Sequence, residues 1–526
     1  MNRIAVTIIA AGIISMVPGA YGQSHSKATV VYPPVSAVPD SVFELIPSRD
    51  RDAAKQFYTK YIDVKGLPVL ASKEVADLAL QRTYEIVTSM LAGRPDVLKA
   101  MAKQGMYLII IGKNQVYTDM PEYRNTRNPD FQNERVRGTG GLPTSFGEEN
   151  LLNLPLDRYD DESIGVHEFS HTIDSTLSRM DRAWSGKLNT AYRNAVQKGL
   201  FKGTYAGSNS AEYWAENVQV YFNCNRVNNY NHGPIGRRDQ FKIYDPVGYE
   251  LVKSTFNLSP EQDWSYTWLN PFPNIVPPPA KFNINPYYTK FTWAREFTVL
   301  GRQATDEAML KVNETIRRLF AYRHDILKAL IADGVKMAVL GHDEQLSDLP
   351  EYEQLSPAEK GAGARYLGYY PQTKLLVVDQ ENVMSKANDM YAADCQVIRV
   401  MASAIYHVTG TRPVDPEWEN RPRNIWQQYE LNVQRMDVRF DEKLKEIYEN
   451  ALSQGKWKGT PAINSRVDYW TMGLLAYFDA VGLGTPPNDA ERPIKTREQL
   501  KEYDLALYEL VDQTMAYNGK VDWRYY

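Results

Sequence analysis

The hydrophobic residues of the chain follow helical spacing in some stretches and form short continuous runs in others. Between positions 75 and 90 they recur at intervals typical of one face of a helix, at Val75, Leu78, Ile86 and Met90. The runs 107–111 and 337–340 are short and almost wholly apolar, which predicts buried strands. Helices followed by a strand in each half of the chain predict an α+β fold with small sheets.

A further helical stretch carries the candidate chemistry. Its apolar stripe is formed by Ile164, Phe169, Ile173 and Leu177. The acidic run 160–162, followed by Ser163, suits the N-terminus of a helix, where the helix dipole favours negative charge. The stretch is therefore expected to form an amphipathic helix packed against the core.

Two histidines lie beside this stripe with the spacing of metal ligands. His167 and His171 are one helical turn apart, so both imidazoles can reach one metal ion. Glu168 directly follows the first histidine, which carries its carboxylate beside the open position of the metal. There it can take a proton from a bound water without being a ligand itself. The pattern is typical of the active-site helix of zincins.

A catalytic zinc needs a third protein ligand, and a second helical stretch, 205–222, supplies a candidate. Glu212 and Glu216 are four residues apart and therefore share a helix face. Glu212 is the candidate ligand, and Glu216 could accept a hydrogen bond from the outer nitrogen of a ligating histidine, with His167 the first choice. The alternative is a pair of solvated glutamates, which the neighbouring Tyr213 and Trp214 disfavour.

Several sequence blocks recur in the same order in the second half of the chain. Residues 57–61 match 287–291, and residues 94–100 match 323–329. The blocks 105–123 with 334–352 and 188–195 with 444–451 continue the series. This repetition predicts two copies of one domain, at 40–268 and 285–526, joined by a proline-rich linker at 269–284.

The candidate chemistry is missing from the second copy. Aligning Val166 with Val400 puts Met401, Ala402 and Ile405 opposite His167, Glu168 and His171. In the same comparison Asp468, Met472 and Pro461 stand opposite Glu212, Glu216 and Tyr205. Such residues cannot form a zinc site of the usual kind, so the second copy is expected to be degenerate and the chain to bind one zinc ion.

These motifs together resemble a known family. The segment 167–174, the tyrosine Tyr205 and the segment 209–216 are similar to the catalytic signature of the anthrax lethal factor-like zinc metallopeptidases, in the same order and with the same step from Tyr205 to Glu212. The resemblance implies a zincin-like, gluzincin-type domain in which His167, His171 and Glu212 bind zinc and Glu168 is the general base. It further implies that Tyr205 donates a hydrogen bond to the developing oxyanion and that Glu216 supports a ligand. The catalytic copy comes first here, the reverse of the order in the family's namesake.

The start of the chain predicts export. Arg3, the apolar run 4–17 and the small residues at 20–22 are typical of a secretory signal peptide at 1–22, cleaved after Gly22. An N-terminal membrane anchor is the alternative, but the apolar run is too short to span a bilayer comfortably. Export permits a disulfide, and the sequence leaves open whether the only two cysteines, Cys224 and Cys395, form one.

Length and charge narrow the classes of partner. At 526 residues the chain exceeds what a single core usually serves, and its net charge of −4 with no basic run argues against nucleic acid and against stable membrane association. The expected function is a secreted zinc endopeptidase acting on a peptide or protein, with the segment 140–144 near the sheet edge that pairs with an extended substrate. The alternative is a secreted binding protein whose zinc site is structural or vestigial. Glu168 and Tyr205 favour the enzyme, because neither is needed to hold a metal.

Overall fold

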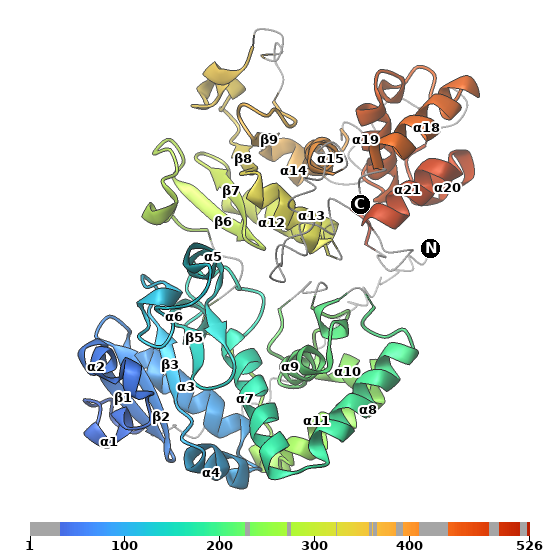
Figure 1. Ribbon diagram of the computed structural model, residues 1–526. Coiled ribbons are helices and arrows are strands. Elements are labelled where there is room, and N and C mark those ends of the chain that lie inside the picture. Colours follow the sequence, from blue (N-terminus) through green and yellow to red (C-terminus); the bar gives the residue numbers. More distant parts are fainter. Residues whose placement is uncertain are drawn as a thin grey trace, which may run out of the picture.

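The protein is described here by a computed structural model (Figure 1). It describes residues 32–202, 204–226, 232–270, 275–321, 323–356, 360, 365–385, 393–409, 440–482, 494–515 and 523–525. The predicted signal peptide at 1–22 lies outside the described residues. Helices predominate over strands, and the strands form two small mixed sheets, which confirms the expected α+β class. We refer to residues 32–270 as the N-terminal half and to residues 275–525 as the C-terminal half.

The sheet of the N-terminal half has the strand order β1-β2-β3-β5-β4. Its strands are β1 (Tyr58–Val64), β2 (Leu67–Ser72), β3 (Leu108–Ile111), β4 (Gly138–Thr139) and β5 (Thr144–Gly147). β1 and β2 form an antiparallel hairpin, β2, β3 and β5 are parallel, and the short edge strand β4 runs antiparallel to β5. All four residues of β3 are buried, as expected for a strand covered on both faces.

The remaining elements of the N-terminal half are helical. The helices are α1 (Asp40–Phe43), α2 (Ser48–Phe57), α3 (Asp77–Met90), α4 (Pro95–Lys103), α5 (Pro129–Arg135), α6 (Glu148–Leu151), α7 (Ile164–Met180), α8 (Trp184–Gln197), α9 (Ser210–Tyr221), α10 (Arg238–Tyr244) and α11 (Pro246–Phe256), with 3-10 turns η1 (Tyr117–Asp119), η2 (Tyr205–Gly207) and η3 (Pro260–Gln262). The predicted helix before the first strand run is α3, but Leu78 is exposed, and Leu80 and Val87 lie in the core with Ile86 and Met90.

The C-terminal half contains a four-stranded sheet in the order β6-β7-β8-β9. Its strands are β6 (Lys290–Ala294), β7 (Phe297–Gly301), β8 (Lys336–Leu340) and β9 (Leu375–Asp379). Its helical elements are α12 (Asp306–Leu319), α13 (His324–Ala332), α14 (Gln380–Met384), α15 (Gln396–Val408), α18 (Phe440–Ser453), α19 (Arg466–Tyr477), α20 (Arg497–Tyr503) and α21 (Leu505–Met515), with 3-10 turns η4 (Ala280–Phe282), η5 (Leu346–Asp348), η6 (Tyr352–Gln354) and η7 (Pro461–Ile463).

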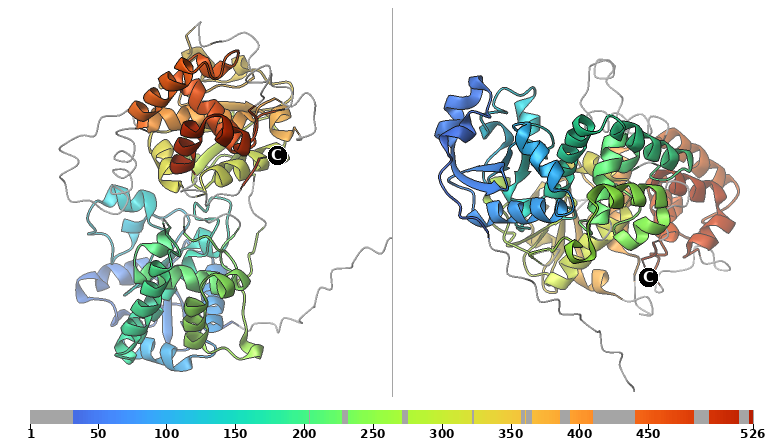
Figure 2. Two further views of the ribbon diagram at one scale, coloured as in Figure 1. Left: turned by 90° about the vertical axis from the view of Figure 1, so that its right-hand side faces the viewer. Right: turned by 90° about the horizontal axis from the view of Figure 1, so that it is seen from below.

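Each half has hydrophobic cores of its own. Two clusters of buried apolar side chains are built from residues 42–266 and two from residues 288–515, and none of these clusters among the described residues mixes the halves. The views of Figure 2 show the two halves as adjoining bodies. Cys224 and Cys395 are buried, unpaired thiols, one in a core of each half. No helix in the described ranges is long and apolar enough to cross a membrane.

The same side-chain hydrogen bonds recur in both halves. The Tyr58 hydroxyl donates to Glu122 Oε2 at 2.7 Å, and that of Tyr288 donates to Glu351 Oε2 at 2.7 Å. The ammonium of Lys60 donates to Asp77 Oδ1 at 2.7 Å, just as Lys290 donates to Asp306 Oδ1 at 2.7 Å. The Tyr213 hydroxyl donates to Asp245 Oδ2 at 2.5 Å, and the Tyr469 hydroxyl donates to Asp504 Oδ2 at 2.7 Å. These pairs define equivalent positions independently of sequence alignment.

One such pair corrects the alignment of the candidate helix with its counterpart. The Trp214 indole donates to the Ser170 carbonyl at 2.8 Å, and the Trp470 indole donates to the Ala402 carbonyl at 3.1 Å. Ser170 therefore corresponds to Ala402, which makes the alignment of Val166 with Val400 wrong by two positions. The residues equivalent to the candidate set His167, Glu168 and His171 are Arg399, Val400 and Ser403. An isolated valine could not fix the register, because α15 is rich in buried apolar residues.

The repeated tyrosine–aspartate bond gives a matched test of this equivalence. Both aspartates are almost completely buried. Each also accepts a hydrogen bond from a backbone N–H in the first turn of the helix that follows it, and so caps that helix. We expect Tyr213→Phe and Tyr469→Phe each to lower the free energy of unfolding by about 1.5–3 kcal/mol, the range for a lost hydrogen bond to a charged group. Urea unfolding followed by fluorescence measures both. A loss in one variant alone would show that the two bonds are not equivalent.

Candidate metal centre

The candidate site lies where α7 and α9 pack against each other (Figure 1). The Ser163 hydroxyl accepts a hydrogen bond from the Val166 N–H and caps α7, whose apolar stripe is buried as predicted. The Asn209 side chain accepts from the backbone N–H groups of Ala211 and Glu212 at 2.9 and 3.0 Å and so caps α9. Both helices therefore begin at defined residues close to the candidate ligands.

Three potential ligand atoms converge from these two helices. His167 Nε2 lies 3.2 Å from His171 Nε2 and 3.2 Å from Glu212 Oε2, and the remaining side of the triangle, His171 Nε2 to Glu212 Oε2, is 3.4 Å. Tetrahedral zinc with bonds of about 2.0–2.1 Å separates its ligand atoms by roughly 3.3–3.4 Å. The three side chains thus fit one zinc ion in both chemistry and spacing.

The charges around this triangle favour a cation. Glu212 Oε2 is buried and receives no hydrogen bond from any described group. Burial by itself would raise the pKa of Glu212, but the adjacent His167 and His171 outweigh it and hold that pKa well below its usual range. Burial likewise disfavours the charged form of His167, yet the carboxylates of Glu212, Glu216 and Glu168 raise its pKa well above the ordinary value. The carboxylates around His167 therefore favour positive charge at the triangle.

Glu168 lies beneath a glycine-rich segment that follows the edge strand. A Cβ at Gly140 would come 2.5 Å from His171 Cβ, and one at Gly138 would come 3.0 Å from Glu168 Cγ, so the segment rests directly on α7. Burial raises the pKa of Glu168, although the histidines and the Gly140 N–H oppose the shift. The edge strand of the sheet is β4, and the segment 140–144, expected near the edge, runs from the end of β4 to the first residue of β5.

Tyr205 stands at the start of η2, with its ring centroid 6.2 Å from that of His167. The turn is held from both sides, because the Tyr192 hydroxyl donates to the Gly207 carbonyl at 2.9 Å and the Ala206 N–H donates to the His232 carbonyl at 2.9 Å. Burial, followed by the carboxylates of Glu212 and Glu168, raises the pKa of the Tyr205 hydroxyl. The hydroxyl therefore stays protonated and is available as a donor.

The outer nitrogen of His167 has a partner that sequence reasoning missed. His167 Nδ1 lies 3.0 Å from Gln219 Oε1, closer than the expected partner Glu216, whose Oε1 is 3.4 Å away. The amide nitrogen of Gln219 donates to Glu162 Oε2 at 3.1 Å and to the Ser163 carbonyl at 3.1 Å. Since both are acceptors, the amide orientation is fixed and Oε1 must face His167. Nδ1 then carries the proton, and the Nε2 lone pair points to the ligand triangle.

Glu216 instead belongs to a neighbouring buried cluster. His232 Nδ1 lies 2.8 Å from Glu216 Oε1 and 3.3 Å from Glu162 Oε2. Burial lowers the pKa of His232, but the two carboxylates outweigh it and raise that pKa to about 10. An imidazolium at this position balances two buried negative charges next to His167. The sequence held a signal for Gln219, which follows Glu212 by two helical turns, but none for His232, which lies in a loop.

The acidic run 160–162 lies directly before the N-terminus of α7, as expected, but its side chains contact other parts of the protein. The first turn of α7 contains no acidic side chain. Asp160 and Asp161 face arginines of the C-terminal half, while Glu162 faces Gln219 and His232. The first N–H groups of α7 are instead bound by the Ser163 hydroxyl and by the side chain of Asn150, which accepts from the Ile164 N–H at 2.7 Å.

A comparison of the chain with models of known protein families found no family that matches. A comparison with curated proteins likewise found no match.

Removing the Gln219 amide should weaken metal binding without removing a ligand. We expect Gln219→Leu to lower zinc affinity about 10- to 100-fold, because His167 loses the acceptor that fixes its tautomer. Competition against a chromogenic chelator measures the affinity. Gln197→Leu, at an exposed position at the end of α8, is the control and should bind as wild type does. Wild-type affinity in the Gln219→Leu variant would contradict this role.

Proposed function

We propose that the protein is a secreted, zinc-dependent endopeptidase of the gluzincin type. The observation that carries the proposal is the near-equilateral triangle of His167, His171 and Glu212 ligand atoms with Glu168 on the same helix beside it. The resemblance of residues 167–174 and 209–216 to the lethal factor-like metallopeptidases adds to it. In this proposal residues 40–268 are a zincin-like catalytic domain, and residues 285–526 are a degenerate second copy, as the matched hydrogen bonds of the two halves support.

In this proposal His167, His171 and Glu212 hold one zinc ion per chain. Zinc bound there supplies a Lewis acid that lowers the pKa of a water molecule to roughly 7 and polarises the scissile carbonyl. Glu168 is next to His167 in the chain but makes none of the three ligand contacts, so its carboxylate is free to accept the proton of the attacking water. Burial raises its pKa, and a proton it has accepted can therefore pass on to the leaving amine nitrogen.

Tyr205 and the edge strand complete the proposed reaction. The Tyr205 hydroxyl is protonated and interacts with Glu212, and its ring lies 6.2 Å from that of His167, so we infer that it can donate to an oxyanion that forms only in the transition state. Among the described strands β4 pairs with β5 alone, so we infer that an extended peptide can add to the outer edge of β4, directly over α7. The substrate proposed is therefore an extended peptide segment.

Glu168→Gln tests the proton acceptor. The amide is nearly isosteric but cannot accept the proton, so we expect the rate to fall by about 10²-fold or more with zinc content unchanged. Cleavage of a peptide library by protein beginning at Gln23, read by mass spectrometry, measures the rate, and metal analysis gives the zinc content. Glu250→Gln, on the exposed face of α11, is the control. Retained activity would place the base elsewhere, and absence of chelator-sensitive cleavage in the wild type would favour a binding protein.

Tyr205→Phe tests the oxyanion donor. We expect kcat to fall roughly 10²- to 10³-fold, the range for losing one such donor, while KM and zinc content hardly change. Tyr249→Phe, a tyrosine whose ring packs on α9 and α10 from α11, is the control for the loss of a hydroxyl. If the only role of Tyr205 is to pack its ring against its neighbours, Tyr205→Phe will leave kcat unchanged and Tyr205→Ala will instead lower the melting temperature.

A further inference from the structure

The turn between β6 and β7 has a backbone conformation that its residues do not favour. Arg295 and Glu296 form this two-residue turn with φ values of 53° and 70°. The equivalent turn between β1 and β2 is Lys65-Gly66, with φ values of 53° and 94°. Two-residue hairpin turns of this kind strongly prefer Asn-Gly, and other residues persist there when their surroundings hold them. Arg295 and Glu296 are thus expected to have side-chain partners that stabilise the turn.

Both side chains are buried where the two halves meet. Arg295 is only 3% exposed, and its Nε and Nη2 lie 3.1 and 3.0 Å from Asp161 Oδ2 of the N-terminal half. Glu296 accepts from Lys328 Nζ at 2.6 Å and lies 3.9 Å from Arg158 Nε of the N-terminal half. We call Arg295 and Glu296 the hairpin tip. The tip places a positive and a negative side chain against the segment that precedes α7.

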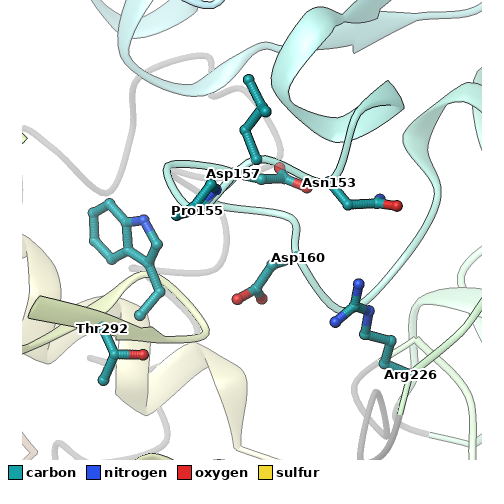
Figure 3. A pocket seen from close by; sticks show the side chains of 8 residues that line it. Asn153, Pro155, Asp157, Asp160, Arg226 and Thr292 are labelled. Atoms are coloured by element: carbon teal, nitrogen blue, oxygen red, sulfur yellow. The ribbon is translucent and has the colours of Figure 1, made fainter. Parts of the chain in front are cut away.

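A second arginine of the C-terminal half reaches the same segment. Arg317 of α12 donates from Nη2 to Asp160 Oδ1 at 2.9 Å, and its Nη1 lies 3.6 Å from Asp161 Oδ2. Its own position is fixed by Asn313 Oδ1, which accepts from Nε at 2.7 Å. Figure 3 shows Asp160 at an adjoining crevice, which residues of both halves line, among them Asp157, Arg226 and Thr292.

The segment held in this way leads directly to the metal centre. Asp161 precedes Glu162, whose Oε2 accepts the hydrogen bond that fixes the Gln219 amide. Gln219 in turn orients His167. Removing the arginines would take the paired cations from the buried Asp161 and the partly buried Asp160, and carboxylates that lose such partners favour a move toward water. Glu162 directly follows Asp161 in the chain, so a movement of Asp161 would displace Glu162 as well.

We propose that the C-terminal half positions the metal centre of the N-terminal half through the hairpin tip and Arg317. Arg295 and Arg317 are positioning residues that hold Asp160 and Asp161, and thereby set Glu162, Gln219 and the tautomer of His167. The inference rests on the proposed metal centre. It gives the half without metal ligands a role within the same chain, as a structural clamp on the segment before α7.

The first test replaces both residues of the hairpin tip with a sequence that favours the same two-residue turn. The full-length variant Arg295→Asn with Glu296→Gly has the preferred turn sequence, so the hairpin itself should form readily. Co²⁺ is the probe, because its visible absorption reports ligand geometry. We expect the Kd for Co²⁺ to rise at least about 10-fold and the absorption spectrum to change, with circular dichroism unchanged. Lys65→Asn makes the same turn change in the exposed β1–β2 hairpin and should leave Co²⁺ binding unaltered.

A second set of three variants leaves the turn unchanged. Arg317→Met should weaken Co²⁺ binding, Arg317→Lys should restore part of it by keeping the charge, and Arg318→Met on the same helix, whose partner is Glu314, should have no effect. Wild-type Co²⁺ affinity and spectrum in both Arg317→Met and the tip variant would overturn the inference and leave the proposed function intact. A wild-type protein that binds no Co²⁺ or Zn²⁺ would overturn both.

Discussion

The hydrogen bond from the Trp214 indole to the Ser170 carbonyl fixes how α9 lies along α7, and the candidate metal centre depends on that contact. A carbonyl in the middle of α7 accepts it, so the bond sets both the register and the rotation of one helix against the other. With that register, Glu212 in the first turn of α9 meets both histidines of α7 at 3.2 and 3.4 Å. A shift by one residue would rotate Glu212 about 100° away from them.

The C-terminal half shows that this packing does not require the metal ligands. Trp470 makes the equivalent bond to Ala402, while the positions of His167, Glu168 and His171 are occupied by Arg399, Val400 and Ser403. The helix pair is therefore stable with quite different side chains at the place of the triangle. The packing of the helix pair therefore does not require the three candidate ligands and Glu168 of the N-terminal half, which is the main reason to assign them chemistry.

Charge balance links the two halves. Around the start of α7 the N-terminal half buries several carboxylates, of which Glu162 and Glu216 are balanced by His232 within the same half. The negative charge of Asp161 is instead balanced by two arginines of the C-terminal half, at the junction of the two halves. Burial would raise its pKa, but Arg295 and Arg317 outweigh burial and hold the pKa below its ordinary value. Asp160 differs, because burial exceeds the effect of Arg317 and raises its pKa to about 7. The junction is thus part of the electrostatic environment of the candidate site.

The sequence by itself determined the features that depend on local spacing. The helix α7 and the shared helix faces of His167 with His171 and of Glu212 with Glu216 follow from a period of 3.6 residues. The strands β3 and β8 follow from short, continuous apolar runs, and the two kinds of element together give the α+β class. It also predicted which two segments would meet, because the ligand count of a zinc site requires a third group. Repeated blocks gave the equivalence of the two halves in outline.

Only the tertiary structure decided the rest, since those contacts join residues far apart in the chain. Gln219 rather than Glu216 lies closest to His167 Nδ1, because the carboxylate of Glu216 turns to His232, a loop residue with no periodic signal. The two-residue error in aligning α7 with α15 arose because apolar patterns repeat along a buried helix, whereas a hydrogen bond between helices has one register. The acidic run before α7 suggested an interaction with the helix dipole, but two of its members, Asp160 and Asp161, pair with arginines more than a hundred residues away. Local spacing specifies which face a side chain occupies, and packing alone specifies what that face meets.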